Sequence, residues 1–439
     1  MDFLARDNII AEISPIGKGA VSAIRLSGKD SRLISETIFN TKIEKPRMAY
    51  FLRSEIDDLV LIYYKAPASY TGEDICEIFC HGNPLIVNNI IDSIVSLKEY
   101  KVRLAQPGEF TKRAYLNNKM DLIQAESVAD IINSSSEISI KLRNKVLKGE
   151  LSNKINKIKE ELLSISGLAE LEIDFEEEKA GVFDSRKTKT QIKDIIDDVD
   201  LMIDSSSQIE RATKDITVAI VGDTNVGKSS LFNSLIGKQR SIVHHVPGTT
   251  RDYIESVVSM DGFNILFIDT AGFRTDTECQ VELEGIKRTI DLGDAAFFVI
   301  EVFDADNYVF KYEKSLKVRN KVDIKKPEKQ IDEVIYISAK TGEGLKELKE
   351  NIIRTLVYDL GLDDKRTHEF MLSKRQNLLL KKLKEELCQI IQSIDLGAYV
   401  DAVSYLLRQA VLLINDLLGK EQNNDETIED VFSKFCIGK

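Results

Sequence analysis

The 439-residue sequence contains no tryptophan, 4 histidines, 7 prolines and 5 cysteines. The cysteines are odd in number and scattered: Cys76, Cys80, Cys279, Cys388 and Cys436. Cys76 and Cys80 lie close together, but no second pair completes the spacing of a structural zinc site. We therefore expect reduced thiols in a cytoplasmic protein.

A hydrophobic run of bilayer length and an excess of positive charge are also missing. The longest apolar stretches, such as residues 295–300, are far shorter than the about 20 residues of a spanning helix, so no membrane contact is expected. The 60 lysines and arginines are outnumbered by 72 acidic residues, giving a net charge of −12. Contact with RNA would therefore need a local patch or a partner. Lysine-rich segments within 141–159 and 374–384 are candidates, although such helix faces are more often only solvated.

The chain is too long for one core, so about two to four domains are expected. Residues 1–118 mix short β-rich runs with Gly and Pro and predict a small α+β domain. In residues 119–212 and 359–439, apolar residues recur every three or four positions, which is typical of helices. In residues 213–358, strand-like runs alternate with helical ones, which favours a mostly parallel sheet covered by helices. We predict an α/β and α multidomain fold, in which the domain of residues 213–358 is inserted into a discontinuous helical domain.

Residues 222–229 read G-D-T-N-V-G-K-S and lie between a strand-like run and a helical one. This pattern is typical of a phosphate-binding P-loop, in which glycines let backbone N–H groups surround the phosphates at a helix N-terminus. Lys228 is expected to reach the β- and γ-phosphates, and Ser229 to bind Mg²⁺. The expected nucleotide contacts here are Asn225, Val226, Gly227, Lys228, Ser229 and Ser230.

Three further motifs follow in the order typical of GTP-binding proteins. The segment 248–252 supplies Thr250 for Mg²⁺ and the γ-phosphate, and 269–272 places Asp269 near Mg²⁺ and the Gly272 amide near the γ-phosphate. In 320–323, Asp323 can accept two N–H bonds from guanine, whereas adenine would present a lone pair to it. GTP is therefore predicted over ATP. The remaining expected contacts are Thr270, Ala271, Asn320, Lys321, Ser338, Ala339 and Lys340.

The sequence differs from the small signalling GTPases at the residue that follows 269–272, a position that is important for hydrolysis. Those proteins usually carry a water-orienting glutamine there, whereas this chain has Phe273. Arg251 and Arg274 are candidate arginine fingers, but each is more often structural. Hydrolysis therefore needs another charge donor and another group that positions water.

These departures, together with motifs along the whole chain, resemble the MnmE (TrmE) family of tRNA-modifying GTPases. The motifs are residues 14–20, 24–28, 70–74, 80–82, 107–111, 121–126, 248–252 and 435–439. The resemblance implies an N-terminal folate-binding domain in residues 1–118, a homodimer built through that domain, and an inserted G domain. It also implies a heterotetramer with an FAD-dependent partner of the MnmG (GidA) type. Such complexes add an aminomethyl or carboxymethylaminomethyl group to C5 of the tRNA wobble uridine.

In this family K⁺ takes the place of the arginine finger. The resemblance implies that Asn225 binds K⁺ together with the loop 244–249, through backbone carbonyls and Thr249. That loop consists of His244, His245, Val246, Pro247, Gly248 and Thr249. It also implies that Glu282 orients the attacking water, although Glu278 and Glu284 lie nearby and Glu284 stays an alternative.

The resemblance further implies a tetrahydrofolate derivative, 5-formyl or 5,10-methylene, as the one-carbon donor. Arg25, Glu77, Lys119 and Lys439 match the folate-binding positions, and carboxylate and cations suit a pterin and a glutamate tail. Cys436 can be read as a nucleophile or as a packing residue, since no paired base is visible.

Two questions stay open on the sequence. His81 is either functional or a core histidine, and Asn83 stands where the family usually has a second glycine after Gly82. The alternative function is a regulatory GTPase switch in ribosome assembly. Such a switch has no use for the N-terminal motifs or for the Cys-Ile-Gly-Lys end.

Overall fold

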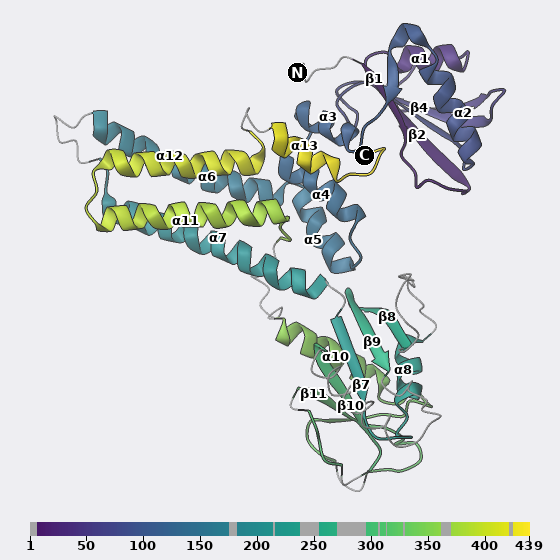
Figure 1. The fold of residues 1–439 in the computed structure, drawn as a ribbon, viewed down its shortest axis with the longest axis vertical. Coiled ribbons are helices and arrows are strands. Elements are labelled where there is room, and N and C mark those ends of the chain that lie inside the picture. The colour runs from purple at the N-terminus through teal and green to yellow at the C-terminus, as the bar shows by residue number, and fades with distance from the viewer. Residues whose placement is uncertain are drawn as a thin grey trace, which may run out of the picture. The chain divides into compact units, whose positions relative to one another are not determined.

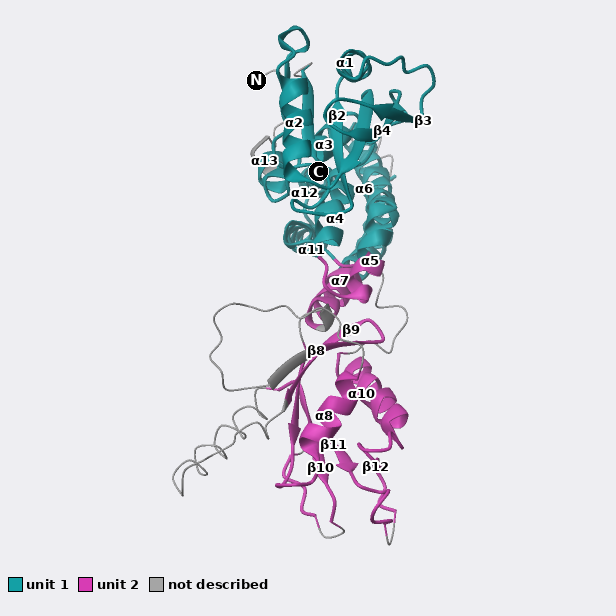
Figure 2. Ribbon diagram, turned by 90° about the vertical axis from the view of Figure 1, so that its right-hand side faces the viewer, with its two compact units in different colours: residues 1–133, 143–199, 372–439 teal, residues 134–142, 200–371 magenta. Residues whose placement is uncertain are grey.

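The computed structural model separates the chain into two compact units, residues 1–133, 143–199 and 372–439, and residues 134–142 and 200–371 (Figure 2). It describes residues 7–174, 182–213, 216–237, 254–269, 296–305, 308–312, 314–327, 330–360, 370–420 and 425–439. The side chains of residues 212–213, 254–256, 269 and 425–427 lie outside this description. Within those ranges, every helix is too short or too polar to cross a bilayer.

The first unit opens with a six-stranded mixed sheet in the order β3-β4-β5-β2-β1-β6. Only the pairing of β1 with β6 is parallel. Helices α1 (Ser31–Ile38) and α2 (Pro84–Val95) cover one face of it (Figure 1). The strands are β1 (Asn8–Glu12), β2 (Val21–Ser27), β3 (Ala49–Arg53), β4 (Asp58–Tyr64), β5 (Ile75–His81) and β6 (Val102–Leu104).

Alternation along these strands decides which residues form the core. In β5, Cys76, Ile78 and Cys80 are buried against the two helices, while Glu77 and Phe79 point to the other face. Burial raises the pKa of Cys76 to about 12 and that of Cys80 to about 11, so both thiols stay protonated at neutral pH. The opposite face of the sheet remains partly exposed.

The rest of the first unit is helical. Helices α6, α11 and α12 pack lengthwise with the first part of α7, as Figure 1 shows. Segments more than 200 residues apart in sequence thus share one core, which confirms the discontinuous helical domain. The helices are α3 (Glu109–Leu116), α4 (Leu122–Ile132), α5 (Glu137–Leu147), α6 (Glu150–Asp174), α7 (Ser185–Thr213), α11 (Lys374–Asp395), α12 (Val400–Leu418) and α13 (Asp425–Ser433). Residues 137–142 of α5 and 200–213 of α7 belong to the second unit.

The motif at residues 121–126 joins the two halves of the helical domain. Asp121 and Gln124 form a capping box that begins α4. Glu126, buried on that helix, accepts hydrogen bonds from Arg375 Nε at 2.7 Å and Ser373 Oγ at 3.2 Å at the start of α11. Because this carboxylate is paired and hydrogen-bonded, its burial favours one arrangement of α4 and α11.

The second unit contains a six-stranded sheet in the order β12-β11-β10-β7-β9-β8. All pairs are parallel except β8 with β9, as strand–helix alternation predicted. Helices α8 (Lys228–Ile236) and α10 (Leu345–Asp359) supply apolar residues to the core on one face. The strands are β7 (Ile216–Val221), β8 (Ile254–Met260), β9 (Phe263–Asp269), β10 (Phe298–Phe303), β11 (Ser315–Arg319) and β12 (Val334–Tyr336).

Candidate functional site

The nucleotide-binding motifs lie at one edge of the second sheet. Strands β7, β10, β11 and β12 run parallel, so their carboxyl ends meet there. The P-loop follows β7, residues 320–323 follow β11, and residues 338–340 follow β12 closely. Asp269 ends β9 opposite Ile220 of β7. The order of the strands thus brings together motifs that are far apart in sequence. Open α/β sheets bind their ligands at this edge.

The P-loop glycines are required by close backbone approach. Gly222 has φ +148°, and a Cβ there would lie 2.0 Å from the carbonyl oxygen of Val302. Gly227 has φ +96°, and a Cβ there would lie 2.3 Å from Asn320 Nδ2. Each position therefore excludes a side chain, and the loop keeps the bare backbone that a phosphate cradle needs.

Lys228, the first residue of α8, is held within this loop. Its side chain is buried, and Nζ donates to the carbonyl oxygens of Gly222 at 2.9 Å and Asp223 at 2.8 Å. Ser229 and Ser230 follow in the first turn with exposed side chains. The helix N-terminus thus combines a cation, hydroxyl groups and free backbone N–H groups, which suit a nucleotide phosphate with Mg²⁺.

Asn320 connects the three motifs. Its buried side-chain amide donates to Val226 O at 2.9 Å and accepts the Ala339 N–H at 3.0 Å. Ser338 is also buried, and its hydroxyl oxygen accepts the Thr341 N–H at 3.1 Å, which fixes the turn that carries Ala339 and Lys340. The Asp323 side chain is exposed at the same edge and can meet a base.

Several expected site residues lie outside the described residues. They are His244, His245, Val246, Pro247, Gly248, Thr249, Thr250, Thr270, Ala271, Gly272 and Glu282, together with the Asp269 side chain. Arg251, Arg274, Glu278 and Glu284 fall there too.

A second polar cluster lies on the open face of the N-terminal sheet. Arg25 of β2 and Glu77 of β5 are cross-strand partners, and Glu77 Oε1 accepts from Arg25 Nη2 at 2.8 Å and from Nε at 3.0 Å. The Arg25 guanidinium lies 4.7 Å from the centre of the Tyr70 ring and 5.5 Å from that of Phe110. Burial and the Glu77 carboxylate raise the pKa of Tyr64 on the neighbouring strand β4. Charged and aromatic groups are thus concentrated within a small area.

The last four residues of the chain reach this cluster. The Phe110 N–H donates to Lys439 O at 3.1 Å, and the Gly108 N–H to Cys436 O at 3.4 Å. Burial and the charge of Arg25 lower the pKa of Lys439. Arg25, Glu77 and Lys439 therefore come together, with Cys436 exposed nearby. Lys119, also expected at this site, is exposed and donates to Pro67 O at 2.9 Å.

Sequence reasoning gave no role to the aromatic side chains of this cluster. Tyr70 and Phe110 belong to motifs noted in the sequence, 70–74 and 107–111, and Tyr70 Oη lies 2.8 Å from Thr111 Oγ1. The only signal was their presence in those motifs, because the sequence does not reveal that the two segments meet.

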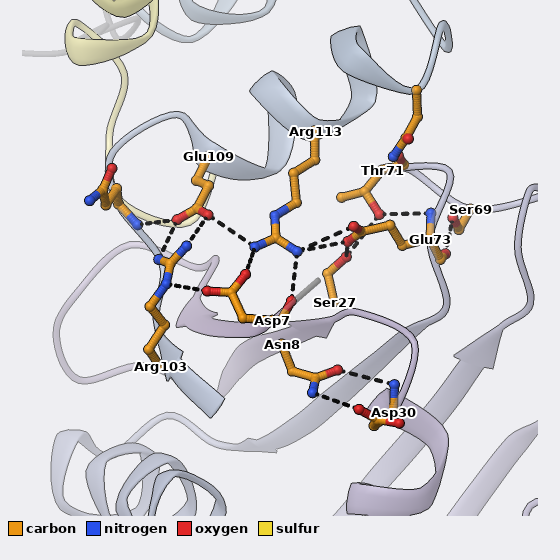
Figure 3. Close-up of polar contacts among 12 residues, drawn as sticks. Asp7, Asn8, Ser27, Asp30, Ser69, Thr71, Glu73, Arg103, Glu109 and Arg113 are labelled. Atoms are coloured by element: carbon orange, nitrogen blue, oxygen red, sulfur yellow. Dashed lines mark hydrogen bonds and ion pairs between the residues drawn. The ribbon is translucent and has the colours of Figure 1, made fainter. Parts of the chain in front are cut away.

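A partly buried ion-pair network, centred on Arg113, holds the two segments together (Figure 3). Arg113 of α3 donates to Asp7 Oδ1 at 2.8 Å, to both Glu73 oxygens at 3.2 Å, and to Glu109 Oε1 at 3.1 Å. Arg103 pairs with Asp7 and Glu109, each at 2.6 Å. Burial opposes ionisation of Glu109, but hydrogen bonds from Arg103 and the Gln106 N–H hold its pKa below the ordinary value. The network fixes α3, and with it Phe110, against β1 and the loop that carries Tyr70.

His81 is not a core histidine, because its side chain is 69% exposed. Asp57 accepts from its backbone N–H at 2.8 Å, and Asp57 Oδ1 lies 2.7 Å from His81 Nδ1. Asn83 has φ −124° and caps α2 by accepting the Leu85 N–H. A backbone with negative φ has no need of glycine, which explains why asparagine is tolerated there.

The ordered P-loop, base-reading motif and sheet edge define a P-loop GTPase, a GTP hydrolase. Two family models match consecutive parts of the chain: "GTP-binding protein TrmE N-terminus" matches residues 8–119, and "MnmE helical domain" matches residues 122–436. The chain belongs to the MnmE (TrmE) family.

Known relatives agree over the full length. The chain is 36% identical to the tRNA modification GTPase MnmE of Fervidobacterium nodosum, covering 100% of this chain and 99% of the relative. It is also 36% identical to the protein of that name from Aquifex aeolicus, covering 99% of this chain and 100% of the relative. Among solved structures, the G domain of the T. maritima FeoB iron transporter matches 32% of this chain and 98% of its own, with 30% identity and a TM-score of 0.25.

Proposed function

We propose that this protein is a K⁺-activated GTPase that modifies tRNA. With an FAD-dependent partner of the MnmG type, it adds an aminomethyl or carboxymethylaminomethyl group to C5 of the wobble uridine. The observation that carries the proposal is the presence of two sites in one chain. A GTP-binding edge and the cluster of Arg25, Glu77 and Lys439 occur together, and a purely regulatory switch has no use for the second.

In the proposed GTPase site, Ser229 and Thr250 bind Mg²⁺ with Asp269 nearby. Asn225, the carbonyls of the 244–249 loop and Thr249 bind K⁺. When bound, these cations offset charge that develops on the phosphates. Lys228 holds the phosphates, Asp323 reads guanine, and Glu282 orients the attacking water. The proposed G domain is residues 213–358, within a helical domain of residues 119–212 and 359–439.

The proposed folate-binding domain is residues 1–118. At its folate site, Glu77 accepts pterin N–H groups, while Arg25 and two lysines from outside that range, Lys119 and Lys439, meet the glutamate tail. The residues fit such a ligand, because the Arg25 guanidinium, paired with the Glu77 carboxylate, lies beside the flat rings of Tyr70 and Phe110. When bound, the tetrahydrofolate derivative supplies the one-carbon unit. Cys436 is exposed beside this cluster and is the nearby thiol proposed to act on it.

The proposed homodimer uses the open face of the N-terminal sheet. An apolar row crosses this face next to the row of Arg25 and Glu77. It consists of Phe51 on β3, Val60 on β4, Phe79 on β5 and Ala23 on β2. The side chain of Phe51 is 63% exposed, and Val21 on the same face is 61% exposed. An exposed apolar row on a sheet suits burial against a second copy.

Nucleoside analysis of tRNA tests the function directly. In a strain that lacks the gene, wobble uridines are expected to lose the C5 modification, and the intact gene is expected to restore it. A variant with Glu77→Gln should fail to restore it while retaining GTP hydrolysis, because Glu77 belongs to the first compact unit and the nucleotide-binding motifs to the second. Full modification in the deletion strain would exclude the enzyme role and favour the ribosome-assembly switch.

The cation requirement is tested by exchanging Na⁺ for K⁺ at constant ionic strength. GTP turnover is expected to rise at least about tenfold in K⁺, since a well-placed positive charge is worth more than 1.4 kcal/mol in the transition state. Asn225→Ala should remove the difference between the salts. Equal turnover of the parent protein in both salts would refute the role of K⁺.

A further inference from the structure

The connection between β10 and β11 is short for two parallel strands. It spans residues 304–314, and its described residues contain no helix. Parallel strands usually need a crossover of a dozen or more residues, most often helical. Here the segment instead lies on the sheet through aromatic side chains, with Tyr308 stacked on Phe303 at 4.9 Å between ring centres.

A buried carboxylate anchors this connection. Glu301 of β10 is fully buried and accepts hydrogen bonds from Tyr308 Oη at 3.1 Å, Lys311 N at 2.8 Å and Ser315 Oγ at 3.2 Å. Burial and the Glu301 carboxylate raise the pKa of Tyr308, so its hydroxyl remains a donor. The middle of the segment and the start of β11 are therefore fixed to the strand that precedes Asp304.

Asp304 is the first residue of the connection, and a single lysine, Lys321, links it to the P-loop. Asp304 Oδ2 lies 2.7 Å from Lys321 Nζ, and the same Nζ donates to the carbonyl oxygen of Asn225 at 2.6 Å. Lys321 and Asn225 both have left-handed backbone conformations, with φ +64° and +62°. Such conformations are unfavourable for residues other than glycine and persist where neighbouring contacts hold them.

We propose that Asp304 is a positioning residue for nucleotide binding. By holding Lys321 Nζ over the Asn225 carbonyl, it fixes the middle of the P-loop to the base-reading motif. The tie between Asn320 and Val226 O fixes the following peptide. Without Asp304, the Lys321 ammonium is free to leave the carbonyl for solvent, and Asn225 loses one support of its left-handed backbone. The bound nucleotide then dissociates faster.

The test measures release of a fluorescent GDP analogue from the full-length protein by stopped flow. Asp304→Ala is expected to speed release about tenfold, as for loss of one hydrogen bond to a charged group. Asp304→Asn should stay within about threefold of the parent, because its amide oxygen still accepts from Lys321 Nζ. In a Lys321→Met background, Asp304→Ala should change release less than about twofold, because the two residues act as one unit.

Glu333→Gln is the matched control. Glu333 pairs with Lys317 at 3.6 Å in the same unit but is 83% exposed, and the variant should release GDP at the parental rate. The inference is overturned if Asp304→Asn releases GDP as fast as Asp304→Ala. The inference is also overturned if Asp304→Ala speeds GDP release as much in the Lys321→Met background as in the parent. Either comparison remains informative if Asp304→Ala alone lowers stability.

Discussion

Asp323→Asn is expected to lower the affinity for GTP by about 10²- to 10⁴-fold. The carboxylate can accept two N–H bonds from guanine, and hydrogen bonds to a charged group contribute about 1.5–3 kcal/mol each. Asparagine keeps one acceptor but turns an amide donor toward the guanine amino group. The same donor suits xanthine, which carries a carbonyl there, so affinity for xanthosine triphosphate should rise.

Titration with fluorescent GTP and xanthosine triphosphate measures both affinities. Because the Asp323 side chain is exposed, the variant should unfold at the parental temperature. Asp332→Asn, an exposed carboxylate of the same unit, serves as the control and should leave both affinities unchanged. If Asp323→Asn retained the parental preference for GTP, the assignment of residues 320–323 to the base would be wrong.

Arg113→Met is expected to destabilise the N-terminal sheet by about 3–5 kcal/mol. Removing Arg113, the most buried cation of the network, leaves Glu73 without its cation and leaves Asp7 and Glu109 to share Arg103 alone. Hydrogen exchange measured on peptides from β1 and α3 reports the free energy of opening of this region. Tyr70 and Phe110 should also lose their fixed positions around Arg25.

Arg32→Met is the matched control for this loss. Arg32 pairs with Glu36 at 3.1 Å on the surface of α1, and its side chain is 39% exposed. Such a pair contributes about 0.3–0.5 kcal/mol. A cost below about 1 kcal/mol for Arg113→Met would show that the network does not hold the domain together.

The same network predicts how stability depends on pH. The pKa of Glu109 is lowered in the folded protein, so its contribution is present above the unfolded value of about 4.3 and is lost as the pH falls through the folded value. The difference between the parent and Arg113→Met should therefore shrink in acid below about pH 4.

The P-loop could be predicted from sequence because its parts are adjacent along the chain. Strand β7, the loop and α8 follow one another, so spacing alone places Lys228 at a helix N-terminus. The fold class and the discontinuous helical domain were likewise readable from periodicity. The Arg25–Glu77 pair depends on register between strands whose residues are 52 positions apart. The spacing of residues along the chain does not determine that register. The family resemblance indicated that both residues are functional, but not that they contact each other.

Other contacts were hidden for the same reason. The bridge from Asp304 through Lys321 to Asn225 joins three loops at one sheet edge, and no local pattern announces it. The motif at 121–126 was noted in the sequence as a family signature, and its contact with α11 was not predicted. The Asp121–Gln124 spacing does match a capping box, but the partner of Glu126, Arg375, lies 249 residues further on.

The split helical domain has a consequence for synthesis on the ribosome. Helix α6 is complete at Asp174, but α11 begins only at Lys374 and α12 at Val400. At about 5–20 residues per second, the apolar side of α6 waits roughly 10–45 s for α12 to emerge. The strands of the second sheet are all made within that interval. A nascent chain stalled there would leave exposed the side of α6 that later packs on α12, and chaperones that recognise apolar segments would bind it.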